Sequence, residues 1–368
     1  MKIRAAVSRA GAAFPALETL ELEAPRPGEI LVRMVASGIC HTDLGAHAGR
    51  GAGTPKPVVL GHEGAGVVER VGAGVTRLAA GDHVILSGCS CGHCPSCIAD
   101  FPSYCYEMLP RNFGGLRMDG TSALSANGER IFGHFFGQSS FADYAIAPER
   151  SAVKIAADLP LETLAPLGCG VITGTGAIMR ALKVGAGATL AVFGVGGVGL
   201  SAVMAARLVG ASRIIAIDVQ PARLALAREL GATDVIDAHA GEPGKAVREL
   251  SGSGVNFSLN TTPAPEIFTA ALECLAMRGV AGFVTAPRGE WKPAMFPMLA
   301  GGRRLQGILG GDAAPQRFIP ELIEYYRRGQ LPIERLLRFY DFSQIAEAFH
   351  DMEQGAAIKP VLRIGAVH

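Results

Sequence analysis

The sequence has few aromatic residues and almost no net charge. Its 368 residues include one Trp, 6 Tyr and 16 Phe, and the formal net charge is +1. It contains no Lys- and Arg-rich run, so the composition argues against a nucleic-acid partner. Hydrophobic residues make up 49% of the chain and charged residues 18%, which indicates a globular protein rather than a disordered one. The length is sufficient for two domains with separate cores.

Long apolar stretches of the kind found in signals and membrane spans are also scarce. The N-terminus has no extended apolar run behind its basic residues, as a secretory signal requires. The stretch 184–206 is uncharged, but it contains six Gly, and four of these lie within 194–199. This pattern favours a buried strand, a glycine turn and a helix over a bilayer span. We therefore expect a cytoplasmic protein with no membrane partner.

The pattern of predicted secondary structure changes near residue 170. Before residue 150, short β-like runs are broken by Gly and Pro, and no long helical period stands out, which predicts a β-rich domain. The predicted strands are 30–35, 64–71, 83–86 and 142–147. Further along, strands at 189–193, 213–217, 235–237 and 280–284 alternate with helices at 199–208, 221–229 and 265–275, and helices at 317–328 and 343–354 precede a last strand at 360–364. This alternation is typical of βαβ units on a parallel sheet.

A glycine-rich turn follows the predicted strand 189–193 and gives the strongest local signal. Its first glycine permits a tight turn, its second lets a pyrophosphate approach the backbone, and its third lets helix and strand pack closely. The N-terminus of the helix then offers free N–H groups to the phosphates. We assign the turn to Gly194, Gly196, Gly197, Val198 and Gly199. Taken alone, such a motif is weak evidence, because an ordinary glycine turn can have the same pattern.

The end of the next predicted strand indicates which dinucleotide is bound. Asp218 stands 19 residues beyond Gly199, where a carboxylate can accept hydrogen bonds from the adenosine ribose hydroxyls. The same charge would repel a 2′-phosphate, and Arg223 is placed to flank the same ribose. The sequence therefore predicts NAD binding rather than NADP binding.

Five of the eight cysteines fall within residues 89–105. Four of them, Cys91, Cys94, Cys97 and Cys105, have the spacing C-x2-C-x2-C-x7-C. Four thiolates this close in sequence can surround one zinc ion tetrahedrally and leave no open position, which is the pattern of a structural site. We expect Cys89 to take no part in it.

Three other metal-ligating residues are far apart in sequence. Cys40, His62 and Cys169 each stand in a Gly-rich turn, although each is also compatible with a place in the core. Two thiolates and one imidazole would leave a fourth position on zinc for water or an alcohol oxygen, which is the pattern of a catalytic site.

Together these motifs resemble those of the zinc-containing medium-chain alcohol dehydrogenases. The motifs GICHTD, GHEGAGVVERVGAGV, GDHV, the four-cysteine lobe, PLGCG and FGVGGVGLS follow the order of that family. The segments FFGQSSFADYA and IKPVLRI are most similar to its aryl-alcohol (benzyl-alcohol) branch. The resemblance implies an α/β protein with a β-rich GroES-like catalytic domain and a Rossmann domain with a doubly wound parallel sheet. The implied parts are 1–170 with the zinc lobe at 89–105, the NAD-binding part 171–308, and a return to the catalytic domain at 309–368.

The resemblance also implies roles for residues around the catalytic zinc. Cys40, His62 and Cys169 take the ligand positions. Glu63 matches an acidic group that can approach the metal, and Asp43 matches the carboxylate that orients the zinc histidine. Thr42 matches the hydroxyl that accepts the proton of the bound alcohol.

The remaining implied roles concern the cofactor and the proton path. His41 and Lys359 match basic residues near the pyrophosphate, and Thr173 and Val198 match residues that line the nicotinamide. The family's usual relay histidine is replaced by Gly45, so His41, His47 or water must carry the proton onward; a surface role for His47 is an equal alternative.

The expected activity is therefore hydride transfer between a primary aromatic or allylic alcohol and NAD, with two zinc ions per chain. The resemblance implies a homodimer or homotetramer. The alternatives are an S-hydroxymethylglutathione (formaldehyde) dehydrogenase and a general primary alcohol dehydrogenase. A zinc-ribbon binding module, which the four cysteines alone would allow, is disfavoured by the near-neutral charge and the second ligand set.

Overall fold

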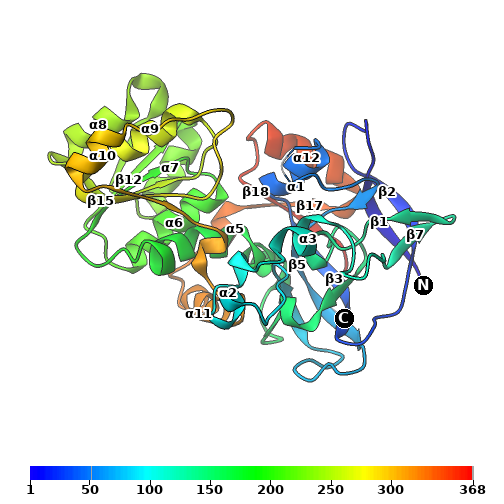
Figure 1. Ribbon diagram of the computed structural model, residues 1–368. Coiled ribbons are helices and arrows are strands. Elements are labelled where there is room, and N and C mark those ends of the chain that lie inside the picture. Colours follow the sequence, from blue (N-terminus) through cyan, green and yellow to red (C-terminus); the bar gives the residue numbers. More distant parts are fainter. Residues whose placement is uncertain (51, 367–368) are drawn as a thin grey trace. The chain divides into compact units, whose positions relative to one another are not determined.

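The computed structural model describes residues 1–50 and 52–366, which divide into two compact units (Figure 1). The first unit contains residues 1–169 and 314–323 and the chain from Ile333 onward, and the second contains 170–313 and 324–332. The family resemblance implied a return to the first domain at residue 309. In the structure the chain returns at 314, and 324–332 then belong to the second unit again.

The first unit is built on two antiparallel-rich sheets. The smaller sheet has the strand order β4-β1-β2-β7-β8, with bounds β1 (Lys2–Ser8), β2 (Ala16–Leu22), β4 (Val58–Val59), β7 (Leu124–Ala126) and β8 (Glu129–Ile131). The larger sheet has the order β10-β6-β5-β3-β18-β17, with β9 also paired to β3. Its strands are β3 (Glu29–Gly38), β5 (Glu63–Val71), β6 (His83–Leu86), β9 (Tyr144–Pro148), β10 (Ala152–Ile155), β17 (Leu337–Asp341) and β18 (Lys359–Arg363).

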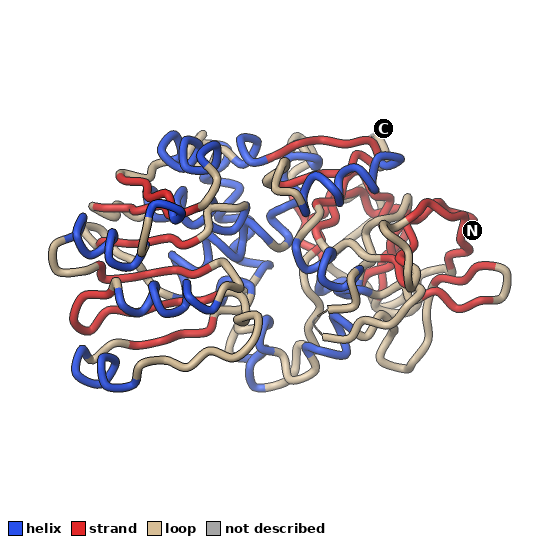
Figure 2. Tube along the Cα trace, turned by 90° about the horizontal axis from the view of Figure 1, so that it is seen from above, coloured by secondary structure: helices blue, strands red, loops and turns tan. Residues whose placement is uncertain are grey.

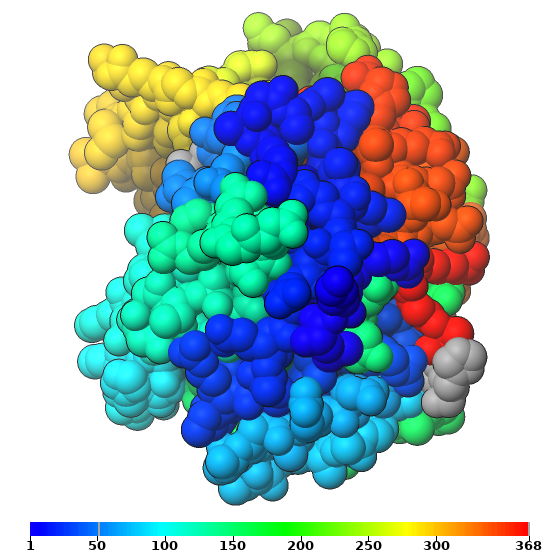
Figure 3. Space-filling view, turned by 90° about the vertical axis from the view of Figure 1, so that its right-hand side faces the viewer, coloured from blue at the N-terminus to red at the C-terminus, as the bar shows by residue number. Residues whose placement is uncertain are grey.

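One core joins these sheets to the short helices of the unit. Fully buried Phe135, Phe141 and Phe349 contribute the largest side chains to it. The helices are α1 (His41–His47), α2 (Pro95–Ile98), α3 (Met108–Phe113), α4 (Leu161–Leu164) and α12 (Ile345–Glu353), with α11 (Pro315–Arg327) running into the second unit. In the space-filling view of Figure 3, N-terminal residues in blue lie beside C-terminal residues in orange and red.

The second unit has a six-stranded sheet in which every strand pair is parallel, in the order β13-β12-β11-β14-β15-β16. Figure 2 shows helices on both sides of these strands. The strands are β11 (Thr189–Phe193), β12 (Arg213–Asp218), β13 (Asp234–Asp237), β14 (Val255–Asn260), β15 (Leu275–Phe283) and β16 (Arg304–Gly307). The helices are α5 (Gly170–Gly176), α6 (Gly197–Leu208), α7 (Pro221–Leu230), α8 (Pro243–Ser251), α9 (Pro265–Glu273) and α10 (Met295–Gly301). The predicted α/β class with a doubly wound parallel sheet is confirmed.

Several elements differ from the sequence prediction. The strands β1, β2, β7 and β8 and the helices α1 to α4 were not predicted, because three to seven residues carry too little periodic signal. The uncharged stretch 184–206 forms β11, the glycine turn and most of α6, as expected. In the described part of the chain, no single helix is long and apolar enough to cross a membrane, while the bent pair 161–168 and 170–181 passes by length and composition.

Candidate metal centres and cofactor site

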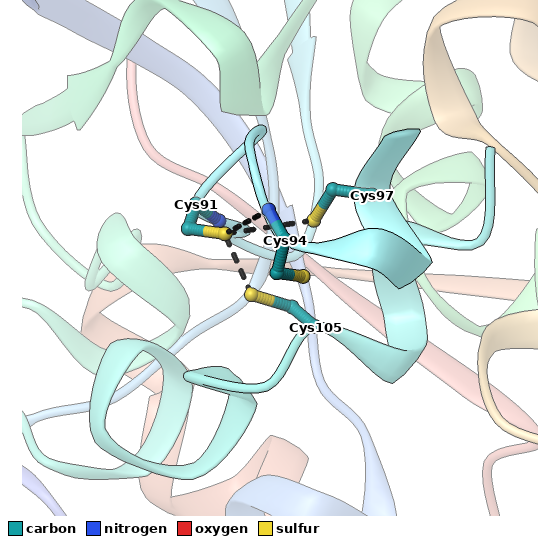
Figure 4. A group of neighbouring side chains, drawn as sticks. All are labelled: Cys91, Cys94, Cys97 and Cys105. Atoms are coloured by element: carbon teal, nitrogen blue, oxygen red, sulfur yellow. Dashed lines mark hydrogen bonds between the residues drawn. The ribbon is translucent and has the colours of Figure 1, made fainter. Parts of the chain in front are cut away.

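The four clustered cysteines converge on one point (Figure 4). Cys91 Sγ lies 3.9 Å from Cys97 Sγ, and Cys94 N–H donates to Cys91 Sγ at 3.3 Å. The N–H of Cys91 donates to Cys105 Sγ at 3.2 Å. The helix α2 begins directly after Cys94 and carries Cys97, so one short turn directs both sulfurs inward.

The electrostatics of the four sulfurs suit a cation. Backbone N–H groups of Tyr106 and Cys97 lower the pKa of Cys94 to about 6, whereas burial raises the pKa of Cys105 to about 12. All eight cysteines of the chain are free thiols. On zinc binding these thiols would release their protons to solvent, and the four thiolates would hold one ion in a closed site. Cys89 lies outside the set, as expected.

The three distant ligands are also brought together. The ligand atoms of Cys40, His62, Glu63 and Cys169 all lie within 4.8 Å of one another. Cys40 precedes α1, His62 precedes β5, and Cys169 follows a 3-10 turn at 165–168. The register explains the meeting, because Gly38 on β3 pairs with Glu63 on β5 and thereby aligns the two turns.

Asp43 connects the first two ligand turns. It is fully buried, and its Oδ2 accepts the N–H of Cys40 at 2.9 Å. Its Oδ1 accepts from Gly61 N at 3.0 Å and lies 3.1 Å from His62 Nδ1. Burial by itself would lower the pKa of His62, but the Asp43 carboxylate raises it well above its usual value. This is the geometry in which a carboxylate sets the tautomer and orientation of a metal-ligating histidine.

The other ring nitrogen of His62 fits a metal. Its Nε2 is buried and has no hydrogen-bond partner among the described residues. An orphaned imidazole nitrogen beside two thiols costs free energy unless a ligand satisfies it. The donor set of Cys40, His62 and Cys169 therefore fits a zinc ion with one position left open.

Glu63 and Lys359 form a buried ion pair next to this ligand set. Lys359 Nζ lies 2.8 and 2.9 Å from the Glu63 carboxylate oxygens and donates to the carbonyl of Ile39 at 3.0 Å. Burial raises the pKa of Glu63 to about 7, although the lysine opposes that shift. The family resemblance implied a place for Lys359 near the cofactor pyrophosphate, and in the structure its ammonium lies against Glu63. The pair depends on Gly38, where a Cβ would lie 2.1 Å from Glu63 Oε2.

The residues of helix α1 divide into two groups. Thr42 Oγ1 lies 3.7 Å from Cys40 Sγ, within the ligand turn, and His41 is exposed. His47, by contrast, is buried at the other end of the helix, where its Nδ1 lies 2.7 Å from Ser8 Oγ and its Nε2 3.0 Å from the carbonyl oxygen of Ala13. These bonds give His47 a structural place in the core, so the surface role considered for it is wrong.

The second unit holds the predicted phosphate cradle. Gly194 has φ +83°, a conformation that favours glycine, and a Cβ on Gly199 would lie 2.0 Å from the Gly194 carbonyl oxygen. Helix α6 begins at Gly197, directly after Gly196, and its first residues include Val198. Three glycines therefore permit the turn and the close packing that the motif predicts.

Asp218 also accepts hydrogen bonds from backbone N–H groups, a structural role that the sequence did not predict. Its Oδ2 accepts the N–H of Val195 at 2.8 Å, and its Oδ1 accepts those of Val219 and Gln220 at 2.8 and 2.9 Å. The carboxylate thus fixes the glycine turn as well as offering lone pairs to a ribose. A Cβ added to Gly196 would come within 3.9 Å of the Arg223 guanidinium, which places that side chain beside the turn.

Thr173 lies on α5, which packs against the beginning of α6. A Cβ on Gly174 would lie 2.1 Å from the carbonyl oxygen of Val198, so the two helices approach at backbone distance. This contact places the Thr173 segment beside the glycine turn within the second unit.

Three residues of this site, Gln138, Ser87 and Phe136, were not predicted from the sequence. Gln138 bonds to the backbone on either side of Glu63, and the Phe136 ring stacks on His62 with centroids 4.5 Å apart. Two of them lie in the FFGQSSFADYA segment, which was used only for its resemblance. No spacing rule links them to the ligands.

Comparisons with known proteins agree with this geometry. Residues 26–157 match the family model "Alcohol dehydrogenase GroES-like domain", and residues 197–326 match "Zinc-binding dehydrogenase". The chain is 46% identical to a geraniol dehydrogenase of Castellaniella defragrans, covering 98% of this chain and 97% of that protein. It is 37% identical to an S-(hydroxymethyl)glutathione dehydrogenase of Synechocystis, covering 98% and 100%. The crystal structure of benzyl alcohol dehydrogenase from Acinetobacter calcoaceticus superimposes with a TM-score of 0.95 at 41% identity, covering 99% and 100%.

Proposed function

Because this chain belongs to the zinc-dependent alcohol dehydrogenase family, we propose that it interconverts primary aromatic or allylic alcohols and their aldehydes with NAD. The proposal rests on one observation: the open ligand set of Cys40, His62 and Cys169 lies beside the ring of Phe136, which stacks on His62. Zinc held by these three residues would supply a Lewis acid that acidifies an alcohol and polarises an aldehyde.

The protein's own groups hold and prepare this site. Asp43 fixes the imidazole of His62 and the N–H of Cys40, so the ligand atoms need little reorganisation. Thr42 carries a hydroxyl in the same turn as Cys40, where it can accept the proton of a substrate alcohol and pass on its own. His47 is not available to continue that path, because Ser8 and Ala13 occupy its ring nitrogens. We therefore assign the next step of the proton path to His41 or water.

The second unit supports NAD as the hydride carrier. The glycine turn offers backbone N–H groups at the N-terminus of α6 for a pyrophosphate. The buried Asp218 carboxylate favours ribose hydroxyls and disfavours a 2′-phosphate, which supports NAD over NADP. By the same resemblance, Thr173 and Val198 are proposed to line the nicotinamide.

Aromatic rings next to the metal ligands support the substrate class. Phe136 is partly exposed and stacks on His62, and the partly exposed ring of Phe113 lies 5.1 Å from Phe136. Such rings favour a flat, conjugated substrate body over a short alkyl chain. Two similar proteins are named for geraniol and benzyl alcohol, which belong to the same chemical class.

A panel of alcohols tests the proposal. Benzyl alcohol, cinnamyl alcohol and geraniol should each give a higher kcat/KM with NAD than ethanol does. The advantage should reach at least tenfold, because each buried CH₂-sized group contributes about 0.8 kcal/mol. S-Hydroxymethylglutathione belongs in the same panel, since a relative that is 37% identical bears the name of that activity. If S-hydroxymethylglutathione gives a higher kcat/KM than every aromatic and allylic alcohol, the protein is an S-hydroxymethylglutathione dehydrogenase. If ethanol does so, it is a general primary alcohol dehydrogenase.

We further propose a homodimer or homotetramer assembled through the second unit. Met277, Met295, Phe296 and Leu299 are 68–79% exposed, and they lie on β15 and the adjacent helix α10. The strand β16 forms an edge of the parallel sheet nearby. A large exposed apolar group beside a sheet edge is typical of a surface that another chain covers. Sedimentation of the wild type and of Phe296→Glu would show whether this surface holds the subunits together.

The cysteine chemistry supports a cytoplasmic location. All eight cysteines are free thiols, and six of them belong to the two ligand sets. Thiols kept for metal binding suit a reducing compartment. Fractionation of cells that produce the protein would test this location.

A further inference from the structure

The turn that follows Phe135 is held in an unusual backbone conformation. Phe136 has φ 52° and ψ 29°, and Gly137 and Ser139 also have positive φ. A bulky residue in the left-handed region is strained, and it persists only where its surroundings determine it. Here Ser139 Oγ accepts the N–H of Phe135 at 2.9 Å and donates to the carbonyl of Val59. The strained turn is therefore locked into the core, and it carries Gln138.

Gln138 uses its amide to hold the segment around His62. The side chain is fully buried, and its Oε1 accepts the N–H of Gly64 at 3.1 Å. Its Nε2 donates to the carbonyl of His62 at 3.1 Å and to the carbonyl of Ser87 at 3.3 Å. One amide thus fixes the backbone on both sides of Glu63 and joins it to the end of β6. The fit is close, because a Cβ on Gly64 would lie 3.0 Å from Gln138 Oε1.

Ser87 extends this connection to the third ligand. Its hydroxyl donates to the carbonyl of Gly168 at 2.7 Å, directly before Cys169. The turn at Gly168 also lies against β6, since a Cβ there would come within 2.2 Å of the Leu86 carbonyl oxygen. The hydrogen bonds therefore run from the His62 segment through Gln138 and Ser87 to the residue next to Cys169.

The three ligand turns are thus joined by two separate links. Asp43 ties the Cys40 turn to the His62 turn, and Gln138 with Ser87 ties the His62 turn to the Cys169 turn. The ring of Phe136, from the same strained turn, stacks on the His62 imidazole at an interplanar angle of 26°. Ligands that lie far apart in sequence need such links to meet in one geometry before the metal arrives.

We propose that Gln138 is a positioning residue that joins the His62 and Cys169 ligand turns, through Ser87, into one preorganised zinc site. This inference rests on the proposed function, because it takes the open ligand set to be the catalytic zinc site. Gln138 acts at a distance from the substrate, so its removal changes the site through the ligands.

The test compares Gln138→Met with a matched control in the same unit. Asn112 is also buried and makes the same three kinds of backbone bond, from Cys89 N and to the carbonyls of Cys89 and Met108. Gln138→Met and Asn112→Leu should both lower Tm. Only Gln138→Met should weaken zinc binding at the open site, by about 10-fold or more, the scale found for groups that orient metal ligands.

Two readouts distinguish positioning from general stability. Elemental analysis after timed exposure to a chelator counts the zinc ions retained per chain. Cobalt(II) introduced into the open site reports the ligand geometry through its visible spectrum, which should shift in Gln138→Met and remain unchanged in Asn112→Leu. Equal zinc retention and an unchanged cobalt spectrum in Gln138→Met, despite a lowered Tm, would overturn the proposal.

Ser87→Ala provides a second, milder variant in case Gln138→Met does not fold. Ser87→Ala should also lower the amount of zinc retained per chain. The double variant should retain as much zinc as Gln138→Met alone, because both residues belong to one link. Independent, additive losses would contradict that link. If the wild-type protein binds zinc only at the four cysteines, the proposed function is refuted. That outcome is seen in the wild type, so it can be distinguished from a failure of the role of Gln138, which is seen only in the variants.

Discussion

The buried ion pair between Lys359 and Glu63 gives a sharp prediction about stability. The side chains of Lys359 and Glu63 are 5% and 0% exposed, and the ammonium lies within 2.9 Å of both carboxylate oxygens. Lys359→Met keeps the length of the side chain but removes the cation and its bond to the Ile39 carbonyl. Removing one partner of a buried pair costs about 3–5 kcal/mol, because the remaining charge keeps its desolvation penalty.

The loss of stability should depend on pH. Burial raises the pKa of Glu63 to about 7, although Lys359 lowers it, so this pKa should rise further in the variant. A carboxyl whose folded pKa lies above its unfolded value stabilises the fold only while it is protonated, and this contribution is lost as the pH rises through the folded pKa. The deficit of Lys359→Met relative to wild type should therefore be smallest below pH 7. Above pH 7 it should grow by up to about 1.4 kcal/mol per pH unit.

The assay is urea unfolding of the metal-depleted protein, the state to which this pKa of Glu63 applies, followed by circular dichroism between pH 6 and pH 9. Lys154→Met is the matched control, because Lys154 pairs with Asp82 at 2.6 Å but is 57% exposed. The control should lose less than about 1 kcal/mol, as exposed pairs do. The double variant Lys359→Met/Glu63→Gln should recover part of the loss, since it removes both buried charges.

Two results would refute this reasoning. One is a Lys359→Met variant within about 1 kcal/mol of wild type at pH 8, which is the range for an exposed pair. The other is a double variant whose loss equals the sum of the two single losses, since contacting charges must show a coupling energy.

Three further predictions concern the metals, the proton and the cofactor. Elemental analysis should find about two zinc ions per chain; Cys94→Ser should mainly lower Tm, whereas Cys40→Ser should abolish turnover while circular dichroism shows a retained fold. Thr42→Ala should lower kcat by about 10²-fold in steady-state assays, and retained activity would remove the hydroxyl from the proton path. Asp218→Asn should weaken NAD binding by about 10-fold or more in a fluorescence titration and reduce the preference for NAD over NADP. The reason is that the substitution removes the charge that binds the ribose and disturbs the bond to Val195. Stronger binding of NADP than of NAD by the wild type would contradict this prediction.

The parts of the protein that could be predicted from sequence are those in which neighbours along the chain are also neighbours in space. The four cysteines lie within 15 residues, so their spacing alone predicts one zinc cage, and the structure brings them together. The glycine turn between β11 and α6 is equally local, because the positive φ of Gly194 and the tight contact of Gly199 depend on a few consecutive residues. The alternation of strands and helices after residue 170 likewise predicted a parallel sheet, which the structure contains.

The open metal site was accessible only through resemblance. Nothing in the spacing of Cys40, His62 and Cys169 predicts that they meet, and the register of β3 with β5 and the packing of the 165–168 turn bring them together. The same register explains why Lys359 pairs with Glu63, a partner that the sequence did not predict. Gly38 pairs with both Glu63 and Val361, so the ammonium two residues before Val361 reaches the Glu63 carboxylate.

The sequence by itself therefore determined the local devices: the zinc lobe, the phosphate turn and the α/β order of the second unit. The tertiary structure alone decided how Asp43, Gln138 and Ser87 join the three ligand turns and which partner Lys359 takes. The physical reason is that backbone preferences act over a few residues, whereas these bonds form between strands and turns whose register is set by the packing of the whole unit.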